Sequence, residues 1–173
     1  MLIVAFWISF AASSVIYAIM VLWSLPRISA EANGLVPFDM RPTGYSLEEA
    51  RSFLAALSKD GRIFYLTTQH RLDAVYPPLM AITLALGLWL LSPSFTLWVR
   101  LPLILVPILA MVSDLTENQL VSDMLNSPVD SLDSELIMTA NTATLIKSAL
   151  TTIAGSLLLA LTAAWAWKRW RRP

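Results

Sequence analysis

The sequence predicts an all-α membrane protein in which four transmembrane helices form a bundle and a short amphipathic helix lies on the outer side. Hydrophobic residues make up 57% of the 173 residues and charged residues only 14%, whereas soluble proteins average about 45–50% and about 25%. Four separate stretches are each apolar over the roughly 20 residues that a helix needs to cross a bilayer. Acidic and basic residues are also segregated along the chain, although the 12 of each cancel overall. We therefore expect a single membrane domain.

The four predicted spans contain few polar interruptions. The first covers about residues 2–25 and has no charged side chain, the second covers 74–92, the third 95–113 and the fourth 147–167. A chain this short cannot bury four such helices in a soluble core. We expect the first span to be an uncleaved anchor, because it is longer than the apolar part of a signal peptide and no Lys or Arg precedes it. Cleavage near Ser29 and Ala30 would leave three spans.

The distribution of charge predicts the orientation. Basic residues favour the cytoplasmic side of a membrane, and the C-terminal tail is strongly basic. Its cations are Lys168, Arg169, Arg171 and Arg172, which we expect to bind anionic lipid headgroups. Residues 113–135 contain acidic side chains and no Lys or Arg, so they are predicted to lie outside. The chain is therefore predicted to be a multi-pass protein of the inner membrane, with both termini cytoplasmic and with outer segments 26–73 and 114–146.

The first outer segment has the pattern of a capped amphipathic helix. Ser46 and Glu49 have the spacing of a capping box, and apolar residues then repeat at helical spacing. These are Leu47, Ala50, Phe53, Leu54 and Leu57. We predict a helix over residues 46–58 that covers the mouth of the bundle; a helix lying on the membrane surface is the alternative. The sequence Lys59-Asp60-Gly61 is predicted to end this helix.

A second outer helix is predicted to begin after Gly61 and to run directly into the second span. Its polar side chains recur at intervals of three and four residues and therefore share one face. They are Arg62, Tyr65, Gln69, Asp73 and Tyr76. Pro77 removes a backbone donor and so frees the carbonyl of Asp73. A freed carbonyl within a membrane needs another partner.

Ionisable side chains from three spans are predicted to reach the same depth. At about 1.5 Å per residue, Asp73, Asp114 and Lys147 lie about 27, 29 and 31 Å from the inner ends of their spans. Because a hydrocarbon core is about 30 Å thick, all three reach its outer boundary. The candidate polar cluster comprises Asp73, Tyr76, Asp114, Glu117, Asn118 and Lys147.

Two interpretations of this cluster are open. In the first, Lys147 pairs with Asp73 or Asp114 and holds the helix ends together. In the second, the carboxylates form a site for a cation, a metal ion or a polar lipid headgroup. The chain has no cysteine and one histidine, His70, so we expect no cofactor and no metal. A metal held by Asp73, Asp114 and Glu117 is the alternative.

The sequence predicts function only coarsely. It contains no phosphate-binding loop, no Gly-x-Ser-x-Gly and no Glu-x-x-His motif, and we expect no nucleic-acid partner. The leading hypothesis is a non-catalytic accessory subunit or scaffold that packs beside other membrane protein subunits, because the chain is small and its last span carries small residues suited to helix packing. The alternative is a membrane-embedded enzyme or ion-binding protein with a carboxylate site at the outer boundary. A transporter is less favoured, because transport sites usually lie near the midplane.

Three short motifs carry a resemblance to a family. Gly61-Arg62-x-x-Tyr65, Asp73-x-x-Tyr76-Pro77 and Asp114-x-x-Glu117-Asn118 resemble a pattern in small uncharacterised bacterial membrane proteins with four helices. The similarity covers roughly residues 38–120. It implies a bacterial inner membrane and brings no function with it.

Overall fold

Four long helices dominate the computed structural model, which describes residues 1–171 apart from the side chain of Asp130. The first runs through α1 (Leu2–Ile19), a π-helical turn (Met20–Ser24) and α2 (Leu25–Glu31). The second runs through α4 (Lys59–Phe64), a second π-helical turn (Tyr65–Gln69) and α5 (His70–Leu91). The remaining elements are α6 (Leu97–Asn126), α7 (Ser134–Trp170), the short helix α3 (Leu47–Ala56) and 3-10 turns at Phe38–Met40 and Val129–Ser131.

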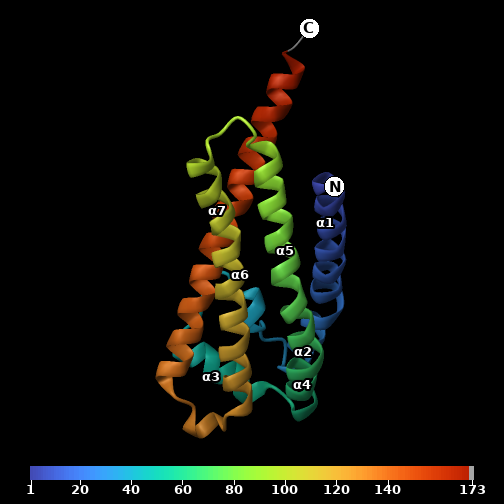
Figure 1. Cartoon of the computed structure of the whole chain (residues 1–173). Helices are drawn as coiled ribbons and strands as arrows, with labels where there is room; N and C mark the ends of the chain where they lie inside the picture. Colours follow the sequence, from blue (N-terminus) through green and yellow to red (C-terminus); the bar gives the residue numbers. More distant parts are fainter. Residues whose placement is uncertain (172–173) are drawn as a thin grey trace.

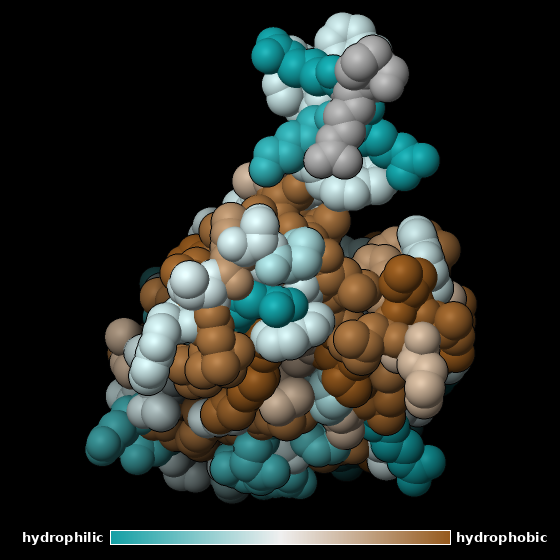
Figure 2. All heavy atoms as spheres, turned by 45° about the horizontal axis from the view of Figure 1, so that its top comes forward, coloured by the Kyte–Doolittle hydropathy of each residue, from teal (hydrophilic) through white to brown (hydrophobic). Residues whose placement is uncertain are grey.

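The predicted fold class is confirmed, since every regular element in the described part of the chain is helical. All four long helices are long and apolar enough to cross a membrane. Hydrophobic side chains cover the sides of the molecule, and hydrophilic ones gather at the tip of α7 and around the opposite rim (Figure 2). Both termini lie at one end of the bundle, here termed the terminal end (Figure 1). The other end, termed the polar end, carries α3 and the loops at residues 32–46 and 127–133.

Helix α5 lies at the centre of the bundle. α1 packs along one side of α5, whereas α6 and α7 pack against α5 and against each other on its other side (Figure 1). α1 therefore stands apart from the α6–α7 pair. This spacing leaves room between the helices for the cavity described below.

Helix α3 closes the polar end, as the capped amphipathic pattern predicts. The Ser46 hydroxyl accepts a hydrogen bond from the Glu49 amide at 3.1 Å, and the Glu49 carboxylate accepts one from the Ser46 amide at 2.7 Å. That backbone hydrogen bond holds the pKa of the Glu49 carboxyl below its usual range. Phe53, Leu54 and Leu57 are buried in the main hydrophobic core, which lies at this end of the molecule. The helix therefore covers the mouth of the bundle and does not lie apart on a membrane surface.

The predicted start of the second outer helix is wrong, although α3 does end at Ala56, before Lys59. Lys59-Asp60-Gly61 does not terminate a helix but opens α4. The Ser58 hydroxyl accepts a hydrogen bond from the Gly61 amide at 2.9 Å, which caps the new helix. Gly61 allows α4 to pack closely against the end of α2, because a Cβ at this position would lie 2.5 Å from Glu31 Cβ.

The first helix extends past the predicted end of its span. It continues through Pro26 to Glu31. Pro26 is tolerated because it falls in the first turn of α2, directly after the π-helical turn in which the Leu25 amide bonds the Met20 carbonyl. The first long helix therefore includes Ser24 and reaches Glu31 without a break.

Candidate functional site

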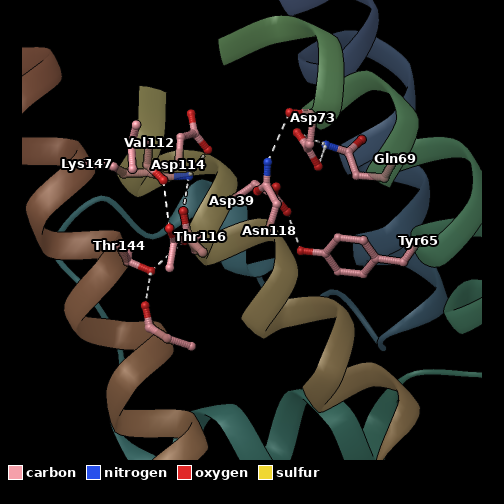
Figure 3. A network of polar contacts seen from close by, with 12 residues as sticks. Asp39, Tyr65, Gln69, Asp73, Val112, Asp114, Thr116, Asn118, Thr144 and Lys147 are labelled. Carbon is pink, nitrogen blue, oxygen red and sulfur yellow. Dashed lines mark hydrogen bonds and ion pairs between the residues drawn. The ribbon is translucent and has the colours of Figure 1, made fainter. Parts of the chain in front are cut away.

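The predicted polar cluster forms near the polar end and consists of two halves that meet on α6 (Figure 3). The ion-pair half lies between α6 and α7. It comprises Asp114, Glu117, Thr144 and Lys147. The amide half joins the first long helix, the second long helix and α6. It comprises Ser24, Gln69, Asp73 and Asn118.

In the ion-pair half, one lysine forms ion pairs with two carboxylates. Lys147 Nζ lies 3.2 Å from Asp114 Oδ1 and forms a second ion pair with Glu117 Oε2. The Thr144 hydroxyl donates a hydrogen bond to Glu117 Oε1 at 2.5 Å. Glu117 is only 1% exposed, so Lys147 and Thr144 replace the water that its carboxylate has lost. Lys147 thus pairs with Asp114, as expected if the cluster holds the helix ends together.

In the amide half, Gln69 links two helices to Asp73. The Ser24 hydroxyl donates to Gln69 Oε1, and Gln69 Nε2 donates to both carboxylate oxygens of Asp73 at 3.0 Å. Asn118 Nδ2 donates to the Asp73 carbonyl at 3.0 Å. That carbonyl is the one that Pro77 frees, so Asn118 supplies the partner that the proline makes necessary. Ser24 and Gln69 both lie in π-helical turns, which are frequent at functional sites.

Asp39 joins the site although no sequence pattern indicated it. It lies in the 3-10 turn Phe38–Met40 of the first loop and accepts a hydrogen bond from the Tyr65 hydroxyl. Figure 3 places it between the two halves, and it lines a small pocket together with Asp73. The site therefore contains four carboxyl groups and one lysine.

The loop that carries Asp39 is fastened to α7. Asn141 Oδ1 accepts a hydrogen bond from the Tyr45 amide at 2.8 Å. Gly44 precedes this contact with a φ of +82°, a left-handed conformation that favours glycine. Burial raises the pKa of Tyr45 well above its usual range, so its phenol stays neutral. Asp39 is thus held by a fixed loop.

A cavity of about 610 Å³ extends from the ion-pair half toward the middle of the bundle. Asp39, Asp114 and Lys147 line its polar end. The rest of the wall is mainly apolar and comes from all four long helices. It includes Phe6, Phe10, Pro77, Met80, Ala81, Leu84, Ala110, Met111 and Leu158. Charged groups therefore lie at one end of a cavity whose other walls are mainly apolar.

Two further predicted residues lie at the margins of the site. Tyr76 lines the large cavity and stacks on Tyr17, with ring centroids 5.8 Å apart. His70 lines a separate pocket of about 10 Å³ beside Asp39 and Asp73, a volume that suits roughly one water molecule.

The three carboxylates of the alternative metal site are divided between the two halves. Asp114 and Glu117 contact Lys147, while Asp73 accepts hydrogen bonds from Gln69. Within residues 1–171, Asp130 excepted, no group of three or more His, Cys, Asp or Glu side chains is arranged to hold a metal ion.

The basic tail forms a separate feature at the terminal end. Lys168 and Arg169 lie in the last turn of α7. Arg169 lies over the Trp165 ring at 5.6 Å and Arg171 over the Trp167 ring at 4.3 Å. Arg172 lies outside the described residues.

Comparison with known proteins adds no relative. No protein-family model, no curated protein and no solved structure matches the chain. The resemblance to small bacterial four-helix membrane proteins therefore stays a prediction.

Proposed function

We propose that the chain binds one amphipathic lipid molecule between its helices, with the acyl chain in the large cavity and the headgroup at Asp39, Asp114 and Lys147. The cavity is the observation that carries this proposal. Its volume of about 610 Å³ falls within the range of about 300–1,000 Å³ typical of small-molecule sites. Its walls are apolar and its charged groups are confined to one end, which is the polarity of a lipid.

The arrangement of the helices supports lateral entry from the bilayer. α1 packs along α5 and leaves the α6–α7 pair on the other side. The cavity is lined by α1 on one side and by α6 and α7 on the other, with α5 between them. A lipid can therefore enter sideways and keep its chain in hydrocarbon. The cavity wall also carries the hydroxyl groups of Ser13, Ser148 and Thr151.

Filling the cavity tests this function. Ala110 is 6% exposed and lines the wall, so Ala110→Phe places a ring where the acyl chain would lie. We expect about tenfold less bound lipid, as follows from an overpacking penalty of about 1–3 kcal/mol. Native mass spectrometry of the protein purified in mild detergent measures lipid per chain.

A second measurement locates the acyl chain of the bound lipid. A phospholipid with a photoreactive group in its acyl chain should label Met80 or Met111. Ala18→Phe is the matched control, since Ala18 is exposed on α1 and does not line the cavity; bound lipid should be unchanged. Equal lipid binding by the two folded variants, or labelling confined to exposed residues, would contradict the proposal.

An accessory or scaffold subunit is the second candidate, and the ion-pair half favours it. Lys147 neutralises Glu117 and Asp114 directly, as a purely structural cluster would. Affinity purification in mild detergent should then recover another membrane protein at constant stoichiometry, and recovery should be insensitive to Ala110→Phe. An enzyme or ion-binding protein remains a third proposal, supported by the group of carboxyls around Asp39 and Asp73.

We also propose that the protein lies in the inner membrane with the polar end outside. The cations of the tail support this orientation, and both termini lie at one end (Figure 1). A reporter fused after the last residue is expected to be active in the cytoplasm, and one inserted near Asn126 to be active outside. Activity of both on one side of the membrane would exclude the arrangement.

A further inference from the structure

The headgroup end of the cavity has an excess of negative charge. Lys147 is its only cation in the described wall, and Asp114 and Glu117 already hold the ammonium group. Its charge is therefore compensated within the ion-pair half. An anionic headgroup arriving at Lys147 would have to compete with two carboxylates that are fixed to α6.

Asp39 has no comparable cation. It is half-buried on the wall, and the Tyr65 hydroxyl is its hydrogen-bond donor. Among the side chains that the structure describes, the ion pairs are the two that Lys147 forms. A carboxylate accepts hydrogen bonds from several directions; Tyr65 occupies one of them and the Asp73 carboxyl lies beside another, which leaves the positions on the side of the large cavity. Asp39 thus presents acceptor positions at the polar end of the cavity.

Resting on the proposed lipid binding, we propose that the bound lipid carries a primary amine in its headgroup, and that Asp39 accepts hydrogen bonds from that ammonium group. A primary ammonium has three N–H donors and balances the negative charge at Asp39. A quaternary ammonium has the charge but no N–H donor, and an anionic headgroup has the wrong sign. The ligand class is a zwitterionic ethanolamine phospholipid.

Competition between three phospholipids with identical acyl chains tests this assignment. Phosphatidylethanolamine, phosphatidylcholine and phosphatidylglycerol are titrated against the full chain in nanodiscs or detergent, and binding is read by native mass spectrometry. We expect the ethanolamine lipid to bind about tenfold more tightly than the glycerol lipid, because a charged hydrogen bond is lost. The choline lipid should lie between them.

Variants at Asp39 assign the preference to this side chain. Asp39→Asn should remove most of the tenfold difference, and Asp39→Glu should retain it. Asp60→Asn is the control, because Asp60 is an exposed acid at the start of α4; the preference should persist. If Asp39→Asn fails to fold, the comparison of the three lipids on the wild-type chain still decides the point.

The failure of this inference differs from the failure of lipid binding itself. Equal binding of the three lipids, or tighter binding of the glycerol lipid, overturns the amine assignment while sensitivity to Ala110→Phe preserves the proposed function. If no lipid binds in a manner sensitive to Ala110→Phe, both proposals fall. Retention of the preference in Asp39→Asn also overturns the inference.

Discussion

Lys147→Ala is expected to lower the free energy of unfolding by about 3–5 kcal/mol, the usual effect of removing one partner from a buried ion pair. The reason is Glu117. Its side chain is 2% exposed, and without Lys147 only the Thr144 hydroxyl contacts its carboxylate. Asp114 loses the same cation at 3.2 Å. Thermal melting in mild detergent measures the effect as a lower midpoint.

Two variants show whether this loss comes from unpaired charge. Lys59→Ala removes an exposed lysine at the start of α4 and should leave the melting midpoint nearly unchanged. Adding Glu117→Gln to Lys147→Ala should restore part of the lost stability, because a neutral amide tolerates burial better than a carboxylate. A Lys147→Ala protein as stable as the wild type would show that the ion pairs contribute little.

Phe53→Ala is expected to destabilise the protein by about 3–5 kcal/mol, the usual range for truncating a fully buried phenylalanine. Phe53 is 0% exposed. Its ring centroid lies 4.9 Å from that of Phe38 and 6.4 Å from that of Tyr65. Phe38 directly precedes Asp39 in the sequence, and Tyr65 donates a hydrogen bond to Asp39. The truncation should therefore also loosen the loop at residues 32–46.

Limited proteolysis together with thermal melting tests the role of Phe53. Phe53→Ala should be cut within residues 32–46 faster than the wild type, and its melting midpoint should be lower. Ser52→Ala changes the exposed neighbouring residue of the same helix and should alter neither measurement. A lower midpoint without faster cleavage would show that α3 does not hold the loop in place.

Features that depend on neighbouring residues could be predicted from the sequence. The four long helices follow from continuous apolar stretches, and α3 follows from the capping pair Ser46 and Glu49. The need for a partner at the Asp73 carbonyl follows from Pro77, and Asn118 meets it. Depth counting brought Asp114 and Lys147 to one level because each lies on a continuous α-helix that extends through its span.

Features that depend on the folded loop could not be predicted. Asp39 lies in an irregular segment without periodicity, and only the contacts of Phe38 and Tyr45 with the core bring it to the site. The pairing of Lys147 with Glu117 depends on how α6 and α7 are rotated against each other. Length and hydropathy do not determine rotation. The predicted start of α4 is wrong because serine is favoured both in helix caps and in turns. The sequence alone therefore does not show that Ser58 caps a helix.

The π-helical turns at Met20–Ser24 and Tyr65–Gln69 act as single-residue insertions in two adjacent helices. A π-helical hydrogen bond spans one residue more than an α-helical one. Since each residue of an α-helix advances the chain by about 100° and about 1.5 Å, deleting one residue from the second turn would rotate α4 against α5. Tyr65 and Asp73 would then face different directions, and the bond from Ser24 to Gln69 would be out of register. A one-residue deletion far from Lys147 would therefore separate paired groups of the amide half without changing any side chain of the ion-pair half.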